Sequence, residues 1–527
     1  MKKVLLIGAV FTFFTSLFAQ NFTTKFDKIE NEKWWGGYNA IGRQMPFGAE
    51  EKRFDLASGT WGNLAVPFFV SNKGRFIYSQ KPFKITFKTD AVEIESEFEK
   101  VGVQKSGGTL KSAYLAAAKK YFVRPGAKLP DELFFSMPQY NTWIELMYNQ
   151  NERDILSYAQ NLEKHGFPKG VFMIDDKWMN EYGNYDFDPK KFSDPKGMVS
   201  TLHKKGFKVM LWVVPYVDLN IPEFEELSQK NMLVLSKYSQ KPLHITWWNG
   251  KSAAYDLTNP ETREYLISTL ENMRKTYGVD GFKFDGGEHL YTSEAQFYEK
   301  SARGWDYLKE YVNIGARFSF NEFRSSWNSP NMPIVQRLAD KFYGWGDLQA
   351  LIPDMIATGL MGSAYACPDM IGGGEYRSFL NKKKGELDER IIVRSCQVHA
   401  LMPMMQFSVA PWRVLSDENL KTCVKFARLH SKFAPYILSL AKHSSKTGEP
   451  IIRAMEYEFP GEGFENVKDQ FMLGDKYLVA PVVNADDFRS VKLPKGTWVD
   501  ELGNKYEGGR EVKIDAPLER LPYFKKM

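Results

Sequence analysis

The sequence of 527 residues predicts an α/β fold, a (β/α)8 TIM barrel with a β domain on either side. Three observations lead to this fold class. The chain is too long for one compact core, which indicates two to four domains. Between about residues 131 and 440, short apolar runs alternate with helical stretches, and eight such units imply a closed parallel barrel. Before and after this region the pattern is strand-like.

Residues 1–19 resemble a secretory signal peptide. Lys2 and Lys3 precede the apolar run VLLIGAVFTFFTSLF (4–18), and Ala19 suits a cleavage site. The run is short for a membrane span, no Cys follows it, and no later stretch has the length and apolarity to cross a bilayer. We therefore expect an exported protein, periplasmic or secreted, with no integral membrane segment once the signal is removed.

Residues 20–124 are predicted to form an N-terminal β-sandwich. The segments RFIYSQ, PFKITFKT and AVEIESEFE alternate or carry β-branched and aromatic residues between Gly, Pro and Asn breaks. The segment KSAYLAAAKKYFV (111–123) is Ala-rich and has no Gly or Pro inside, so it is predicted to be a helix.

Residues 125–445 are predicted to form the barrel. The expected strands are 133–140, 170–176, 207–217, 281–285, 318–323, 341–347, 363–369 and 401–407. Helices are expected over 151–165, 260–277, 294–311, 348–360 and 386–399. An open, doubly wound sheet is the alternative, but nothing resembling GxGxxG follows an early strand, which weighs against a dinucleotide-binding version.

Residues 446–527 turn strand-like again and are predicted to form one or two small β domains. The runs PIIRAMEYEF, QFMLGDKYLVAPVV, SVKLP, TWVDE and EVKI are separated by Gly and Pro.

Composition and residue counts exclude several classes of function. The formal net charge of +6 becomes +4 without Lys2 and Lys3, and no long basic run is present, so nucleic acid is not an expected partner. The three Cys form neither a disulfide framework nor a metal motif, and of seven His only His289 closely follows a strand-end acid. No GxSxG elbow occurs. We expect no metal and no organic cofactor, and the sequence does not predict an oligomeric state.

Carboxylates collect at the ends of the predicted barrel strands, where the catalytic groups of such barrels lie. A single Asp there is commonly a helix N-cap, but acids at four strand ends exceed that structural need. Two carboxylates facing across a pocket are the usual equipment for glycosidic bond cleavage, and aromatic neighbours suit sugar rings. The acids are Asp175, Asp176, Asp285, Glu288, Asp347 and Asp369, and the nearby tryptophans are Trp178, Trp212, Trp247, Trp248 and Trp345.

The segment GVDGFKFDGGE (278–288) resembles the nucleophile strand of glycoside hydrolase family 31, with Asp285 in the nucleophile position. FRSSWNSPNMPIVQRLADKFYGWGD (323–347) resembles the family's next conserved stretch, which implies Asp347 as general acid/base and places Arg324 and Arg337 on its arginines. SAYACPDMIGGG (363–374) is similar to the segment after it, with Asp369 lining the pocket. FMIDDKW (172–178) resembles the motif that holds the sugar hydroxyls, with Asp175 the better match and Asp176 beside it.

The chain departs from the family's α-glucosidases at two places. The Arg-Asn-His that ends their last barrel strand, and whose His binds the sugar ring, is replaced by Gln406-Phe407-Ser408. Lys177 replaces an acid. The segments 175–178 and 405–412 look more like the family's α-galactosidase branch.

The resemblance implies a retaining mechanism, with Asp285 and Asp347 about 5–5.5 Å apart. Lys283 or Arg324 could keep Asp285 ionised, although Lys283 could equally form a structural ion pair. Trp345 could raise the pKa of Asp347 by excluding water. Trp212 and Trp248 are candidate sugar-binding residues, with core packing the competing interpretation for Trp247 and Trp248.

The expected function is a retaining, exo-acting α-glycosidase that hydrolyses terminal α-linked sugars of an oligosaccharide or glycoside, with α-galactosides favoured. α-Glucosidase, α-xylosidase and sulfoquinovosidase activities stay open. A non-catalytic carbohydrate-binding protein on the same scaffold is an alternative of another class. A barrel aldolase or dehydratase would need a Schiff-base Lys or a metal, and only Lys283 is placed for the former.

Overall fold

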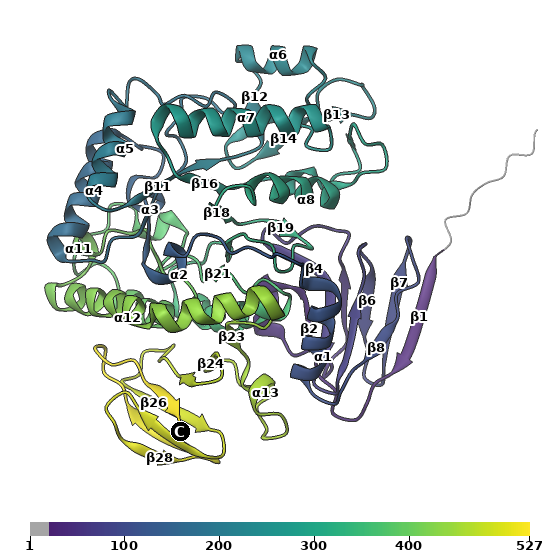
Figure 1. Ribbon diagram of the computed structural model, residues 1–527, viewed down its shortest axis with the longest axis vertical. Helices are drawn as coiled ribbons and strands as arrows, with labels where there is room; N and C mark the ends of the chain where they lie inside the picture. Colours follow the sequence, from purple (N-terminus) through teal and green to yellow (C-terminus); the bar gives the residue numbers. More distant parts are fainter. Residues whose placement is uncertain (1–20) are drawn as a thin grey trace, which may run out of the picture.

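The computed structural model describes residues 21–527, so the predicted signal peptide lies outside the described residues. Figure 1 shows three parts: an N-terminal pair of sheets, a central barrel with its helices, and a small C-terminal β domain. Within the described part of the chain, no helix combines the length and apolarity needed to cross a membrane.

Eight parallel strands form the central barrel, which confirms the predicted fold class. Their spatial order is β21-β20-β18-β16-β11-β10-β9-β22. From β9 to β21 each barrel strand pairs with the next one along the chain, and β22 returns to pair with β9. The buried runs of the longer strands, such as VFMI in β10, suit a sheet covered on both faces. The strands are β9 (Gln139–Asn141), β10 (Val171–Ile174), β11 (Lys208–Val213), β16 (Gly281–Phe284), β18 (Phe320–Phe323), β20 (Gln336–Arg337), β21 (Ala366–Cys367) and β22 (Gln406–Phe407).

Helices follow most strands and cover the outside of the barrel. Most begin at a side-chain cap: the side chain of Asn151 accepts a hydrogen bond at the start of α4, and Asn259 with Pro260 begins α7. The residue before α9, Gly344, provides no such side chain. The helices are α4 (Glu152–His165), α5 (Pro195–Lys204), α7 (Pro260–Tyr277), α8 (Gly304–Gly315), α9 (Trp345–Leu360), α10 (Glu389–Ala400) and α12 (Asp417–Thr447). The predicted helix 294–311 begins later, because Ala295–Gln296 forms a short strand, β17.

The prediction of the sixth barrel strand over 341–347 is wrong. The sixth strand is β20, and α9 already begins at Trp345. Asp347 therefore lies in the first turn of a helix, where an acid interacts favourably with the helix dipole, and not at a strand end. The first predicted strand, 133–140, is also mostly wrong, because its first residues form the short helix α2 (Leu133–Ser136).

The N-terminal part consists of two antiparallel sheets. One has the order β1-β7-β6-β3, and the other contains β2, β4, β5 and β8. Its second sheet includes β19 (Ser326–Trp327), a segment of the barrel region that pairs in parallel with β4. The strands are β1 (Phe22–Asp27), β2 (Trp34–Tyr38), β3 (Lys52–Asp55), β4 (Leu64–Ser71), β5 (Arg75–Tyr78), β6 (Lys84–Phe87), β7 (Ala91–Ser96) and β8 (Val103–Lys105), followed by helix α1 (Leu110–Ala117).

The chain detours between β18 and β20 to make this pairing. No helix stands between these two strands, and the connection passes through β19 instead. The N-terminal sheets are thereby joined directly to the loops above the barrel strands.

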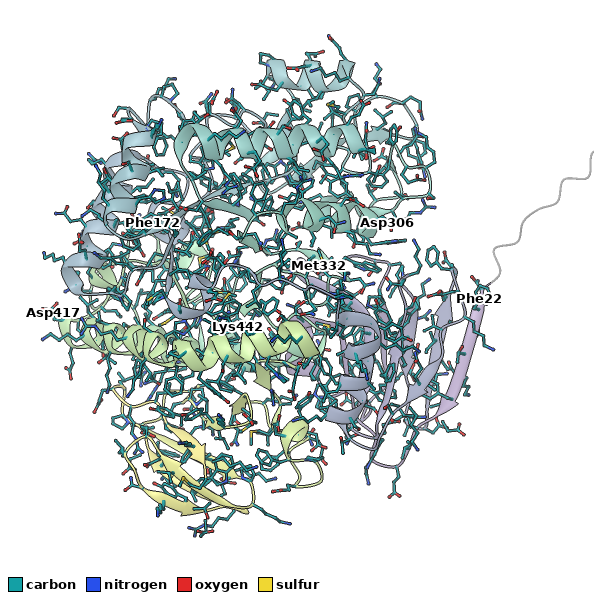
Figure 2. All side chains as sticks on the ribbon, in the orientation of Figure 1. Phe22, Phe172, Asp306, Met332, Asp417 and Lys442 are labelled. Atoms are coloured by element: carbon teal, nitrogen blue, oxygen red, sulfur yellow. The ribbon has the colours of Figure 1, made fainter. Side chains whose placement is uncertain are left out.

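The C-terminal part is a β domain that packs below α12. It contains a six-stranded sheet, with the order β23-β24-β25-β30-β27-β28, and the pair β26 and β29. In Figure 1 the long helix α12 runs between the barrel and this domain, and Figure 2 labels Asp417 and Lys442 on it. The strands are β23 (Ile452–Arg453), β24 (Phe471–Leu473), β25 (Tyr477–Val479), β26 (Phe488–Leu493), β27 (Thr497–Asp500), β28 (Lys505–Glu507), β29 (Arg510–Asp515) and β30 (Tyr523–Lys526).

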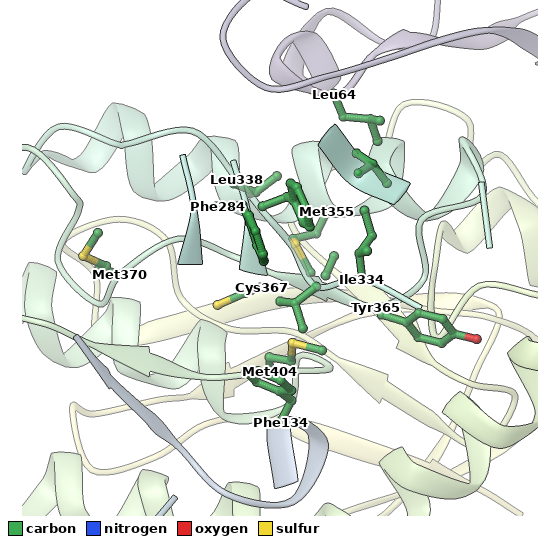
Figure 3. Close-up of a cluster of buried hydrophobic side chains, with 14 of the residues drawn as sticks. Leu64, Phe134, Phe284, Ile334, Leu338, Met355, Tyr365, Cys367, Met370 and Met404 are labelled. Atoms are coloured by element: carbon green, nitrogen blue, oxygen red, sulfur yellow. The ribbon is translucent and has the colours of Figure 1, made fainter. Parts of the chain in front are cut away.

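One apolar core extends through all three parts. Figure 3 shows part of this core, with Leu64 of β4 in the same cluster as the barrel residues Phe284, Cys367 and Met404. The same cluster continues to Phe471 of the C-terminal domain, which also has a smaller core of its own around Trp498. The three cysteines are buried and free, as the sequence predicts.

Candidate active site

A pocket of about 610 Å³ opens at the carboxyl ends of the barrel strands, where barrel enzymes carry their catalytic groups. Each of five strands contributes a side chain at or just beyond its end. In chain order these residues are Asp175 after β10, Trp212 in β11, Asp285 after β16, Arg324 after β18 and Asp340 after β20.

Asp285 is held by three donors at the bottom of the pocket. The Nε of Arg324 donates to Oδ1 at 2.7 Å, and the indole N–H of Trp212 donates to Oδ2 at 3.0 Å. The backbone N–H of Gly286 also donates to Oδ1, at 2.9 Å. The carboxylate is thus fixed in direction, which suits a group that must attack one atom.

The electrostatics of the pocket keep Asp285 ionised. Burial by itself would raise its pKa, but the positive charges of Arg324, Lys283 and Arg337 outweigh burial and hold the pKa well below its usual range. Asp285 is therefore a carboxylate at any physiological pH.

Arg324 links the pocket to the N-terminal domain. Its guanidinium forms ion pairs with Asp285 and with Glu288, and its Nη1 donates to the carbonyl of Gly62 at 2.7 Å. The ring of Trp248 lies over the same guanidinium, 5.1 Å from its centroid to the central carbon. One arginine thus fixes the candidate nucleophile and supports an aromatic ring of the pocket.

Two adjacent acids after β10 have different partners. Asp175 accepts a 2.7 Å hydrogen bond from the buried Lys283 ammonium, and the two form an ion pair. Asp176 accepts hydrogen bonds from Tyr182 at 2.9 Å and Asn249 at 2.7 Å. Burial, followed by the neighbouring charge of Asp175, raises the pKa of Asp176 to about 7.

Lys283 is therefore an ion-pair partner that also acts on Asp285 through space. Burial would lower its pKa, but the charges of Asp175, Asp285 and Glu322 raise it, so the ammonium stays protonated. The two interpretations left open by the sequence both hold.

Asp340 also lines the pocket and lies on the loop after β20. The buried Arg337 donates from Nη1 to Asp340 Oδ1 at 2.8 Å and to Asp369 Oδ1 at 2.5 Å. The side chain of Asp340 is 46% exposed, whereas that of Asp369 is completely buried. Burial raises the pKa of Asp369 to about 7, and Arg337 opposes this rise.

Eight of the eleven predicted site residues line this pocket. They are Asp175, Asp176, Trp212, Trp248, Lys283, Asp285, Arg324 and Arg337. Asp369 lies behind Arg337 and does not reach the pocket surface. Trp345 is the first residue of α9 and is half-buried, with Arg390 rather than the pocket beside its ring.

Asp347 is the main correction. Its carboxylate accepts a 2.6 Å hydrogen bond from the backbone N–H of Phe342 and is not among the pocket residues. The pocket acid on this side is Asp340, which the sequence analysis missed. The local signal is weak: the true strand, Gln336–Arg337, is polar and only Ile334, Val335 and Leu338 beside it are apolar, and Asp340 follows it.

The barrel and the domain after it match models of a known protein family. The glycosyl hydrolases family 31 TIM-barrel domain matches residues 135–440, and the family's C-terminal domain matches residues 448–527. The chain belongs to glycoside hydrolase family 31.

Among family 31 relatives, the myogenesis-regulating glycosidase of Mus musculus is 32% identical over 430 residues, covering 79% of this chain and 60% of the relative. Alpha-glucosidase 2 of Bacillus thermoamyloliquefaciens is 27% identical over 72% of this chain and 51% of its own. The alpha-xylosidase of Emericella nidulans is 25% identical over 94% of this chain and 66% of its own. The chain thus spans about half to two thirds of the length of these relatives.

Solved family 31 structures share the fold. The dextranase of Flavobacterium johnsoniae, complexed with glucose, superposes with a TM-score of 0.83 at 20% identity, covering 96% of this chain and 66% of that one. An alpha-xylosidase from a soil metagenome, complexed with xylose, gives a TM-score of 0.81 at 19% identity, covering 96% of this chain and 79% of that one.

The side chains at the end of the last barrel strand, where the sequence has Gln406-Phe407-Ser408, are buried in the protein. Gln406 is completely buried and donates to Glu322 at 2.8 Å. Ser408 accepts a 2.8 Å hydrogen bond from the backbone N–H of Ile144. Neither residue is among those that line the pocket.

Lys177 also points away from the pocket, with its ammonium 3.9 Å from the centroid of the Tyr182 ring. Among residues 21–527, no group of three His, Cys, Asp or Glu side chains has the arrangement to hold a metal ion.

Proposed function

We propose that this protein is a retaining, exo-acting α-glycosidase in which Asp285 is the nucleophile and Asp340 the general acid/base. The observation that carries the proposal is the pairing of two unlike carboxyl groups in one pocket. Asp285 is buried, fixed by three donors and kept ionised, whereas Asp340 is half-exposed and reached by solvent water. Family 31 membership supports this pairing, and Asp340 takes the role that the sequence resemblance gave to Asp347.

The proposed reaction is a double displacement. Asp340 donates a proton to the glycosidic oxygen while Asp285 attacks the anomeric carbon, giving a covalent glycosyl-enzyme. After the leaving group departs, Asp340 takes a proton from water, which attacks the same carbon and releases Asp285. Arg337 holds only Oδ1 of Asp340 among the described residues, so Oδ2 is left to carry this proton.

The burial of the pocket residues supports an exo action. The polar groups at the bottom are almost completely buried, among them Asp175, Asp176 and Lys283. A terminal sugar can enter this closed end, but a chain cannot pass through it. The charged pairs there offer donors and acceptors for its hydroxyl groups.

α-Galactosides are the sugar we propose. The support is the likeness of segments 175–178 and 405–412 to that branch, together with Gln406 and Ser408 being turned away from the pocket. α-Glucosides and α-xylosides are the alternatives, because relatives named for these activities match the chain. Sulfoquinovosides are a further alternative.

A non-catalytic binding protein is the candidate of another class. A SITS-binding protein of Tetronarce californica is 25% identical over 281 residues of the chain. The presence of both carboxyl groups in the pocket argues against a purely binding role here.

The deciding experiment measures initial rates on aryl α-galactoside, α-glucoside, α-xyloside and α-sulfoquinovoside for the wild-type protein and three variants. Asp285→Asn and Asp340→Asn are expected to lose turnover of the sugar that the wild type accepts, whereas Asp347→Asn keeps most of it. Loss in Asp347→Asn with turnover preserved in Asp340→Asn would reverse the acid/base assignment. A folded wild type that turns over none of the four would favour the binding-protein alternative.

A further inference from the structure

The loop that follows the candidate nucleophile contains two adjacent glycines in the left-handed region. Gly286 has a φ of 70° and Gly287 a φ of 89°. Glycine adopts this conformation without steric cost, but it has no side chain that could hold the loop in place. The direction of the Asp285 carboxylate depends on this loop, because the backbone N–H of Gly286 donates to its Oδ1 at 2.9 Å.

Tyr216 contacts both glycines. It is the first residue of β12 (Tyr216–Asp218), and its side chain is completely buried. The hydroxyl oxygen accepts a 2.5 Å hydrogen bond from the backbone N–H of Gly287. The ring lies so close to Gly286 that a Cβ atom added there would come within 2.9 Å of it. The phenol thus meets the loop at two consecutive residues.

His289 is the second partner of this hydroxyl. It belongs to the short helix η3 (Glu288–Leu290), and its Nδ1 lies 2.9 Å from the Tyr216 oxygen. The Gly287 N–H already donates to that oxygen, and among the described residues the buried hydroxyl has no other acceptor, so its proton points to Nδ1. Nδ1 is therefore the acceptor, and Nε2 carries the hydrogen of a neutral ring. Burial lowers the pKa of His289 below its usual value, which favours this neutral form.

The rest of the loop is fixed by other residues. Tyr311 of α8 donates to the carbonyl oxygen of Asp285 at 3.0 Å, and Arg324 forms an ion pair with Glu288. For the Gly287 N–H, by contrast, the Tyr216 hydroxyl is the only acceptor within residues 21–527. Removal of this one hydroxyl would therefore release the middle of the loop.

We infer that Tyr216 and His289 are positioning residues for Asp285, and that they act as one hydrogen-bonded unit which keeps the loop after the nucleophile in the conformation needed for attack. A group that must approach its target atom to about 3–3.5 Å loses rate when it is displaced by about 1 Å. The unit has no part in proton transfer, so its loss should lower the rate of attack more than the binding of substrate. The inference rests on the proposed function, because it takes Asp285 as the nucleophile.

The test measures how fast Asp285 attacks. With the 5-fluoro α-glycosyl fluoride of the sugar that the wild type accepts, a bond forms between Asp285 and the anomeric carbon while fluoride leaves with the bonding electrons. Fluoride needs no proton from Asp340, and the trapped glycosyl-enzyme is detected by its added mass. Tyr216→Phe keeps the ring and loses the hydroxyl. It should lower the trapping rate at saturation about 10- to 100-fold, with a much smaller change in the concentration that gives half-saturation.

Tyr140→Phe is the matched control. It also removes a buried hydroxyl that donates to a backbone carbonyl, that of Pro168 at 2.5 Å, and Tyr140 lies outside the pocket residues. This variant should trap the sugar at the wild-type rate.

His289 gives a rescue test. Asparagine places its amide oxygen about where Nδ1 of histidine lies, so His289→Asn should keep most of the trapping rate, whereas His289→Leu should lose it as Tyr216→Phe does. The double variant Tyr216→Phe/His289→Leu should be no slower than the slower single variant, because both changes break the same unit.

A Tyr216→Phe variant that traps as fast as Tyr140→Phe would overturn the inference, as would losses that add in the double variant. Thermal unfolding shows whether each variant is folded. If Tyr216→Phe is not, the comparison of His289→Asn with His289→Leu decides, because His289 is only partly buried, and equal rates in these two would also overturn the inference. A wild type that is never labelled at Asp285 would instead remove the proposed function.

Discussion

The two carboxyl groups of the site, Asp285 and Asp340, suit different steps of the reaction because their surroundings differ. Asp285 takes three hydrogen bonds and lies beside three positive charges, whereas Asp340 has one arginine contact and solvent access. The first arrangement suits a nucleophile that must stay ionised, and the second suits a group that gains and loses a proton in each cycle.

The roles predict how Asp340→Ala behaves. For a substrate whose leaving group needs a proton, such as another sugar, the rate should fall about 10²–10⁴-fold. A dinitrophenyl glycoside needs no proton to leave, so its glycosyl-enzyme should still form at a rate far closer to the wild type. Added azide should attack this intermediate and give a glycosyl azide of the original anomeric configuration, detectable by NMR. An azide product of inverted configuration would show that Asp285 is not a nucleophile.

Asp176 predicts a pH dependence of stability. Burial and the charge of Asp175 raise its folded-state pKa to about 7, above the value of about 3.9 in an unfolded chain. The folded protein then holds a proton that the unfolded chain has released, so this stabilisation is present at low pH and is lost as pH rises toward 7. Between pH 5 and 8 the wild type should lose about 2–3 kcal/mol more than Asp176→Asn, measured by chemical denaturation. Equal losses in the two proteins would remove Asp176 as the source.

Strands and loops explain what the sequence could and could not predict. The strands β10 and β11 carry continuous apolar runs, VFMI and VMLWV, and β16 has two phenylalanines about Lys283, so their positions were predicted well. Strand β20 has two residues and no such signature, whereas the aromatic segment 342–345 after it looks strand-like. The pattern therefore predicts the strand over 341–347 and not at 336–337, and with it Asp347 as the strand-end acid in place of Asp340.

The pocket mouth could not be predicted from local patterns either. Tyr148 and Phe342 are brought together only by the closure of the barrel, since they follow its first and sixth strands. By contrast, Asp285 and Arg324 follow strands that are clear in the sequence. The nucleophile side of the site was therefore predicted, and the leaving-group side was not.

The loop before β4 supports the two arginines of the site. Asn63 is completely buried and donates to the carbonyls of Arg324 at 2.7 Å and Arg337 at 2.8 Å. Asn63→Ala should destabilise the fold by about 1–3 kcal/mol, because buried polar groups lose partners. The fold decrease in kcat should exceed the fold change in KM, because the two arginines orient Asp285 and Asp340. Asn161→Ala on the exposed side of α4 is the control, and an Asn63→Ala variant as stable and active as this control would contradict the role.

Across the whole chain, the three parts behave as one body. The N-terminal domain supplies β4 as the partner of β19, and Asn39 donates to Thr358 of α9 at 3.2 Å. The C-terminal domain accepts hydrogen bonds from α10: Arg394 donates to the carbonyl of Ala516 at 2.7 Å, and Gln397 donates to that of Leu518 at 2.6 Å. These contacts are buried or partly buried, and they involve α9 and α10, the helices that follow β20 and β21.

This continuity predicts that the barrel does not fold alone. A fragment beginning at residue 125 would lack β4, so β19 would lose its partner strand, and Trp327 and the barrel residues that pack around Leu64 would be exposed to water. The fragment would also lack the Gly62 carbonyl that accepts a hydrogen bond from Arg324. We expect the fragment to be insoluble or to lack a cooperative thermal transition. We expect residues 20–527 to unfold in a single cooperative transition in calorimetry. Adding residues 20–124 as a separate chain should restore turnover if the interface is intact, because the missing contacts are non-covalent. A fragment that melts cooperatively and hydrolyses substrate by itself would show that the N-terminal domain is an accessory and that Arg324 needs no support from it.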